Sequence, residues 1–215
     1  MNATDFGKLT TTQIEALAPS QIGSLSNTNL ASLSASQLAA FSTTQIGGLS
    51  PFQLHSLTTT EIGALASTEI AALSLGDLST TGLSALSATQ FAAVTSAQIG
   101  ELSITDLSSL GGTRVSSLNV SQIQGLTPSQ LGGFDVTMFG ELTATQIGAL
   151  PISDIGAIST TVIGALAASQ VQALAVTQIP ALTTTQIEQL TTTSVAAMSP
   201  AQLNALTPAQ VQVLP

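Results

Sequence analysis

A large apolar residue recurs every eight positions along nearly the whole chain. The spacing holds from Leu9 to Leu65, breaks over residues 73–77, resumes at Leu78 and continues to Leu206. The repeating unit is L-[ST]-x-[ST]-Q-I-x-x, and its positions 1 and 6 are apolar in all 25 octads. Self-similarity at a fixed period predicts a solenoid, in which each repeat buries its apolar side chains against its neighbours.

This periodicity also defines the organisation of the chain. We distinguish an N-terminal lead (1–8), a first run of octads (9–72), a break (73–77), a second run of octads (78–213) and a C-terminal end (214–215). We interpret the break, which reads Leu73-Ser74-Leu75-Gly76-Asp77, as a loop at a slip of the repeat register. The prediction is therefore one continuous repeat domain.

Each octad is predicted to hold one short helical turn over its positions 3 to 8. Position 6 and the next position 1 are three residues apart, which makes them neighbours on one helical face. Positions 2 and 5 give the capping-box sequence [ST]-x-x-[QE], with Gln at position 5 in 15 octads and Glu in two. Position 3 is then the first helical residue, where proline is tolerated. Five of the eight prolines occupy it: Pro19, Pro51, Pro128, Pro200 and Pro208.

One long helix does not fit a period of eight, because each octad would drift by roughly 80° around the helix axis and form no apolar stripe. The predicted fold class is all-α, a solenoid or superhelix of very short helices with one helix per eight-residue repeat. The alternative is a β-solenoid with two octads per coil. Proline at position 3 argues against it, because proline cannot donate to the hydrogen bonds between strands.

Composition narrows the class of function. Charged residues make up 6% of the chain, and the net charge of −9 includes two basic residues, Lys8 and Arg114. Nucleic acids and anionic membrane surfaces are bound through clusters of basic side chains, so we expect neither as a partner. We also expect no transmembrane helix, because no run of 18 apolar residues occurs, and no Sec-type signal peptide, because no apolar segment follows Lys8.

We predict no catalytic, cofactor-binding or metal-binding residues. His55 is the single histidine and lies at the variable position 7, where a solvated side chain is expected. Asp77 lacks the set of neighbouring oxygen ligands that calcium requires, and Arg114 replaces Gln at position 5 as drift of the repeat. Asn2 and Asn119 match N-x-[ST], which matters only in a eukaryotic secretory pathway. We expect no enzyme activity, no cofactor and no small-molecule substrate.

Two stretches carry a resemblance to known repeats. Residues 57–65 read L-T-T-T-E-I-G-A-L, and residues 182–187 read L-T-T-T-Q-I. They resemble the tandem LTxxQIxAL tracts of large bacterial proteins, many of which are predicted to be secreted or surface-located. The resemblance covers residues 9–214 and implies a spacer, adhesin or filament role without defining any functional residue.

Three functions are compatible with these observations. We favour a non-enzymatic extracellular structural protein, the self-assembling subunit of a filament or surface layer. Few charges oppose contact between copies, and the first and last octads, with Leu9 and Leu206, lack a neighbour on one side. The alternatives are an adhesin-like spacer or binding module, and an ice-binding protein with regular rows of hydroxyl groups. The expected partner is a second copy of the chain, in a homo-oligomer or filament at the cell surface or outside the cell.

Overall fold

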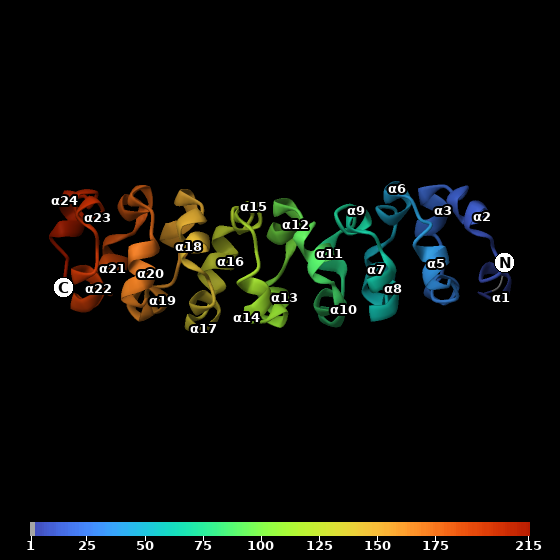
Figure 1. Ribbon diagram of the computed structural model, residues 1–215, viewed down its shortest axis with the longest axis horizontal. Coiled ribbons are helices and arrows are strands. Elements are labelled where there is room, and N and C mark those ends of the chain that lie inside the picture. Colours follow the sequence, from blue (N-terminus) through green and yellow to red (C-terminus); the bar gives the residue numbers. More distant parts are fainter. Residues whose placement is uncertain (1–2) are drawn as a thin grey trace. The chain divides into compact units, whose positions relative to one another are not determined.

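The computed structural model describes residues 3–215, and no β-strand occurs among them. The chain comprises two compact units, residues 1–109 and 110–215, and each unit is an all-α solenoid of short helices (Figure 1). The prediction of an all-α solenoid is confirmed. The alternative of a β-solenoid with two octads per coil is wrong for the described residues.

The helices of the first unit each span a single turn or slightly more. They are α1 (Ala3–Phe6), α2 (Thr11–Glu15), α3 (Pro19–Gly23), α4 (Asn27–Leu30), α5 (Ala35–Leu38), α6 (Thr43–Ile46), α7 (Pro51–Ser56), α8 (Thr59–Ala64), α9 (Ser67–Ile70), the 3₁₀ helix η1 (Leu75–Asp77), α10 (Thr80–Ala85), α11 (Ala88–Ala92), α12 (Ser96–Glu101) and α13 (Ile104–Leu110).

The second unit continues the same pattern. It contains α14 (Gly112–Val115), α15 (Val120–Ile123), α16 (Pro128–Gly133), α17 (Val136–Gly140), α18 (Ala144–Ala149), η2 (Ile152–Ala157), α19 (Thr160–Ala165), α20 (Ala168–Ala173), η3 (Val176–Ala181), α21 (Thr184–Glu188), α22 (Thr192–Ala196), α23 (Pro200–Asn204) and α24 (Pro208–Val211). None of the described helices could cross a lipid bilayer.

Every octad begins its helix at position 3, as the capping pattern predicts. In the octad of α21, the backbone N–H of Gln186 donates to Thr183 Oγ1 at 3.1 Å, and the N–H of Thr183 donates to Gln186 Oε1 at 2.8 Å. Where the N-cap is alanine, as at Ala18, only the second of these bonds forms, here to Gln21 Oε1 at 2.8 Å. The five prolines at position 3 each stand first in their helix, where no N–H is required.

Two octads form a 3₁₀ helix in place of an α-helical turn. In the octad of η2, Pro151 stands at the N-cap position and brings neither a hydroxyl group nor an N–H to the capping box. In the octad of η3, Pro180 lies inside the helix and cannot donate the α-helical bond to the carbonyl four residues earlier. The tighter 3₁₀ turn leaves the position of the apolar side chains unchanged, because Ile155 and Ile179 are both fully buried.

The apolar positions 1 and 6 form the core, as predicted. Ile14 and Ile46 are 0% exposed and Leu142 is 5% exposed. The burial weakens toward the ends of the described chain, where Leu9 and Leu206 are half-buried. The residues at position 6 of the last octads include Leu203 and Val211, which are 40% and 52% exposed.

Three octads make one turn of the superhelix in each unit, and we call this turn a coil. Helices that lie three octads apart contact one another, as do α16 and η2, whose first residues are 24 positions apart. Each unit therefore contains three stacks of helices. The stacks of the first unit are α2–α5–α8–α10, α3–α6–α9–α11 and α1–α4–α7–η1–α12, and those of the second are α17–α19–α21–α24, α15–α18–α20–α22 and α16–η2–η3–α23.

Successive coils approach closely at the small residues of positions 7 and 8. A Cβ atom added at Gly23 would lie 2.5 Å from the carbonyl oxygen of Gly48, which is 25 residues further along the chain. Real Cβ atoms do not come so near a backbone oxygen, so glycine is required at this contact.

The break at residues 73–77 is a shortened octad and not a loop outside the fold. Its last three residues form η1, which packs between α7 and α12 in the third stack, and Leu75 is 0% exposed. The loss of three residues is thus absorbed within one side of one coil. The N-terminal lead also follows the repeat, because α1 begins at position 3 of the octad frame and Phe6, at position 6, is 4% exposed.

Candidate functional site: the glutamine ladder and the outer surface

The glutamines at position 5 make two kinds of hydrogen bond. Gln45 is 2% exposed, and its Oε1 accepts from the N-cap N–H of Ser42 at 2.8 Å. Its Nε2 donates to the carbonyl oxygens of Ile14 and Leu17 at 2.8 and 2.7 Å. These carbonyls are 31 and 28 residues earlier, on the preceding coil. The same side chain therefore caps its own helix and joins two coils.

This arrangement repeats through both units, and we call it the glutamine ladder. Its members include the buried glutamines whose Nε2 donates to the preceding coil: Gln37, Gln45, Gln53, Gln90 and Gln98 in the first unit, and Gln146, Gln178, Gln186, Gln202 and Gln210 in the second. Among the described residues, no buried side-chain nitrogen or oxygen lacks a hydrogen-bond partner. The ladder thus satisfies polar groups that the close packing of coils removes from water.

The sequence separation of the ladder bonds is shorter by three residues where they cross the shortened octad. Gln90 and Gln98 reach back across the break, and their Nε2 atoms donate to Leu65 and Leu73 over 25 residues in place of 28. Bond lengths of 2.8 Å are retained in both cases. The coil contact is therefore the same on both sides of η1.

Glutamate at position 5 keeps the hydrogen bond to its own N-cap. Glu61 Oε2 accepts from the N–H and the hydroxyl of Thr58, each at 2.7 Å, and Glu69 Oε2 accepts from the N–H of Ala66 at 2.6 Å. An ionised carboxylate has no hydrogen to donate to the preceding coil. Burial raises the pKa of Glu69, and the hydrogen bond from Ala66 acts in the opposite direction.

The residues considered as candidate sites in the sequence lie apart from one another in the fold. His55 is exposed in the last turn of α7, Asp77 is half-buried in η1, and Arg114 is half-buried in α14. Asn119 is the N-cap of α15, where its Oδ1 accepts from the N–H of Gln122 at 3.0 Å. Asn2 lies outside the described residues. Within residues 3–215, no group of three or more His, Cys, Asp or Glu side chains is placed to hold a metal ion.

The outer surface carries rows of hydroxyl groups along the stacks. In the second unit, position 4 of consecutive turns in one stack is occupied by Thr137, Thr161 and Thr185, and all three are exposed. In the first unit, the stack that begins at α2 presents Thr12, Ser36, Thr60 and Thr81 in the same way. The third stack of the second unit differs at position 3, where Ile152 and Val176 are 50% and 44% exposed.

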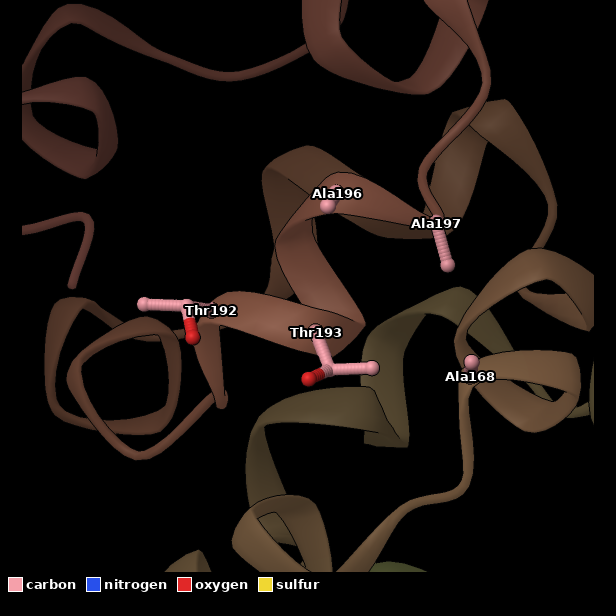
Figure 2. A pocket seen from close by; sticks show the side chains of 5 residues that line it. All are labelled: Ala168, Thr192, Thr193, Ala196 and Ala197. Atoms are coloured by element: carbon pink, nitrogen blue, oxygen red, sulfur yellow. The ribbon is translucent and has the colours of Figure 1, made fainter.

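Two grooves between helices are lined by uncharged side chains. One groove of about 580 Å³ is lined by Ala168 of α20 and by Thr192, Thr193, Ala196 and Ala197 of α22. Figure 2 shows that its lining consists of methyl groups and two threonine hydroxyls. A second groove of about 380 Å³, lined in part by Gln124, Pro151 and Thr177, also has no titratable side chain in its wall. Neither groove brings a nucleophile beside a base.

Sequence reasoning identified the helix caps and the core but missed the ladder. The signal was the preference for Gln over Glu at position 5, 15 octads against two. A capping box accepts either residue, whereas a bond to a carbonyl group of another coil requires an N–H donor.

The comparisons with known proteins concern the C-terminal part of the second unit. No curated protein matches the chain. Residues 147–184 and residues 179–214 each match the family model of the ALTTAQ repeat. The chain is a repeat protein of short helical octads, and about its last third is similar to the ALTTAQ repeat.

Proposed function

We propose that the protein is a non-enzymatic structural solenoid whose copies associate end to end, outside the cell or at its surface. The observation that carries this proposal is the glutamine ladder. The ladder glutamines offer Nε2 donors toward the preceding coil, and the backbone carbonyl groups at positions 6 and 1 are acceptors toward the following one. A contact built from a repeating donor and a repeating acceptor is self-complementary, so a second copy can add through the bonds that join coils within one chain.

The first and last coils expose the groups that such a contact requires. Gln13 and Gln21 occupy the ladder position of the first octads and are exposed, whereas the later ladder glutamines are buried. At the other end, Leu203 and Val211 are 40% and 52% exposed at a position that is buried in most other octads. Contact between the two surfaces would bury both leucine and valine side chains and would supply carbonyl acceptors to the two glutamines.

The charge of the protein is compatible with association. Charged residues make up 6% of the chain, so repulsion between copies has few sources in any one region of the surface. The acidic side chains of the terminal coils include Asp5 at octad position 5 in α1 and Glu15 at octad position 7 in α2, with Glu188 at octad position 7 in α21, and all three are exposed. Burial of apolar side chains then meets little electrostatic opposition.

Sedimentation velocity of the 215-residue chain over increasing concentration tests the proposal. We expect a series of growing species, and we expect the double variant Leu203→Glu, Val211→Glu to remain monomeric because it places carboxylates in the contact. The matched control is Phe52→Glu, since Phe52 is 76% exposed on α7, away from the first and last coils. A single monomeric species of the wild-type chain at every concentration would contradict self-association and leave a passive spacer or adhesin-like binding module.

A location outside the cell rests on the resemblance of the repeat to tracts in secreted and surface proteins of bacteria. Fractionation of the producing cells, with an antibody against the chain, tests this part of the proposal separately. Recovery of the protein from the cytoplasmic fraction alone would contradict it while leaving the assembly test unaffected.

Ice binding is a second candidate, which the exposed hydroxyl rows favour. Thr137, Thr161 and Thr185 repeat at the spacing of the coils on one side of the second unit. If this row orders water at an ice surface, the chain will show thermal hysteresis and the triple Thr→Val variant will lose it. Absence of thermal hysteresis in the wild-type chain would rule this function out.

A further inference from the structure

The glutamine ladder is interrupted in the middle of the first unit. The residues at its position in four consecutive turns, α8, α9, η1 and α10, are Glu61, Glu69, Ser74 and Gly82, since the buried Leu75 takes position 6 in the shortened octad. Ladder bonds are present before this segment, at Gln53, and after it, at Gln90. Two of the four side chains, Glu61 and Glu69, have the length of glutamine and are buried, with 9% and 5% of their surface exposed.

Each of these glutamates retains the bond to its own N-cap. Glu69 Oε2 accepts from the N–H of Ala66, as Gln Oε1 does from the N-cap in the other octads. The second carboxylate oxygen of Glu69 therefore takes the place of the amide nitrogen. From the ladder spacings of 31 and 28 residues at Gln45, we infer that its counterparts on the preceding coil are the carbonyl groups of Leu38 and Phe41. An ionised carboxylate meets these carbonyls as acceptor against acceptor.

The two glutamates differ in the residue that caps their helices. Thr58 gives Glu61 two hydrogen bonds, from its N–H and from its hydroxyl. Ala66 has no hydroxyl and gives Glu69 one bond. Burial then raises the pKa of Glu69 against the opposing effect of this single bond.

The helices packed on α9 offer no charge that would hold Glu69 ionised. Its stack neighbours are α6, with the sequence TTQI, and α11, with the sequence ATQFA, and neither carries a titratable side chain. Along the chain, the nearest titratable groups are the acids Glu61 and Asp77 in the adjacent turns, and His55 is exposed on α7. Burial is therefore the influence that raises the pKa of Glu69, and the hydrogen bond from the N–H of Ala66 opposes it.

The distance between a ladder side chain and the carbonyl oxygens of the preceding coil fits a hydrogen bond better than a shared metal ion. In the neighbouring ladder, the Nε2 atom of Gln45 lies 2.7–2.8 Å from the two carbonyl oxygens that it contacts. An O–H···O hydrogen bond spans a similar distance, about 2.5–3.0 Å. Two oxygens that share a calcium ion lie more than about 3 Å apart, because each oxygen is roughly 2.3–2.6 Å from the ion.

We propose that Glu69 is a proton-dependent link between coils, which joins α9 to the preceding coil when its carboxyl group is protonated and releases this contact when the group is ionised. Protonation takes one H⁺ from solvent, forms the O–H bond and allows that O–H to donate to the carbonyl group of Leu38 or Phe41. The device lies within one chain, so it does not depend on the association of copies.

The direction of the pH dependence follows from the raised pKa. A carboxyl group with a raised pKa binds its proton more strongly in the folded than in the unfolded chain. Its contribution to stability is therefore fully present below the ordinary pKa of 4.5 and is lost as the pH rises through the raised value. Glu69→Gln supplies a permanent donor, so the variant keeps this contribution at neutral pH.

Thermal unfolding of the full chain, followed by circular dichroism between pH 4 and 7.5, tests the proposal. At neutral pH we expect Glu69→Gln to melt about 2–4 °C above the wild type, the shift of one hydrogen bond in a chain of this size. The difference should disappear toward pH 4. The control Glu15→Gln, at an exposed position 7, should follow the wild type at every pH.

Three results would overturn the proposal. One is a Glu69→Gln variant that is no more stable than the wild type at pH 7.5, or whose gain is the same at every pH. Another is a ¹³C NMR titration of the wild-type chain in which Glu69 has a midpoint at or below that of Glu15, a measurement that needs no variant. The third is stabilisation of the wild type, but not of Glu69→Gln, by added Ca²⁺ at neutral pH, which would identify a cation site in place of the proton.

Discussion

Gln186→Glu separates the two roles of a ladder residue within one side chain. Gln186 is 1% exposed, its Oε1 accepts from the N–H of Thr183 at 2.8 Å, and its Nε2 donates to Ile155 and Ile158 at 3.0 and 2.7 Å. Glutamate has the same length and keeps the bond to Thr183. The substitution therefore removes the two bonds between coils and leaves the helix cap.

The magnitude follows from the lost bonds and the buried charge. Two hydrogen bonds contribute about 1–3 kcal/mol to the free energy of unfolding, and a buried acceptor without a donor adds roughly 1 kcal/mol or more. We expect Gln186→Glu to lower the free energy of unfolding by about 2–4 kcal/mol at neutral pH. For a chain of this size, that loss lowers Tm by roughly 5–15 °C.

Gln13→Glu is the matched control for this change. Gln13 is exposed and caps α2 through Thr10, whose N–H donates to Gln13 Oε1 at 2.9 Å. We expect its stability to stay within about 0.5 kcal/mol of the wild type. Urea unfolding followed by circular dichroism measures both variants. Equal effects of Gln186→Glu and Gln13→Glu would refute the claim that the ladder joins coils.

Four further substitutions test the packing and the absence of a catalytic role. Gly23→Ala should lower Tm, because the added Cβ would lie 2.5 Å from the carbonyl oxygen of Gly48, whereas Gly63→Ala in α8 meets nothing within 4 Å and should stabilise the chain by about 0.5–1 kcal/mol in urea unfolding. Ile147→Ala removes a side chain that is 0% exposed and should reduce the free energy of unfolding by about 2–5 kcal/mol. His55→Ala should leave the melting temperature and the sedimentation profile unchanged, and a loss of function from it would reveal a site that the structure does not show.

The local structure was predictable because the octad satisfies several local rules at once. Proline at position 3, a hydroxyl at position 2 and Gln or Glu at position 5 agree on one helix start, and the structure begins its helices there, as at Pro128. Spacing also assigns the core, since Ile14 and Leu142 are both buried. These features depend on residues within a single octad, which a sequence displays directly.

The relations between octads were not predictable in the same way. The number of octads in a coil depends on how the chain turns between successive helices, and no residue of the repeat encodes that angle by itself. Likewise, the five residues from Leu73 to Asp77 were interpreted as a loop, because a shortened octad is recognisable only when η1 is seen between α7 and α12. The excess of Gln over Glu was a signal for bonds between coils, but its meaning requires the carbonyl partners that folding brings near.

Crosslinking between coils tests the central claim, three octads per coil, most directly. The chain has no cysteine, so pairs can be introduced without background. A Cβ atom at Gly132 would lie 3.1 Å from the carbonyl oxygen of Ala157, one coil further on. We expect the double variant Gly132→Cys, Ala157→Cys to form an intramolecular disulfide on mild oxidation, whereas Gly132→Cys, Ala149→Cys, two octads apart, should remain reduced. The opposite result, a disulfide from 132 to 149 and none from 132 to 157, would contradict the three-octad coil.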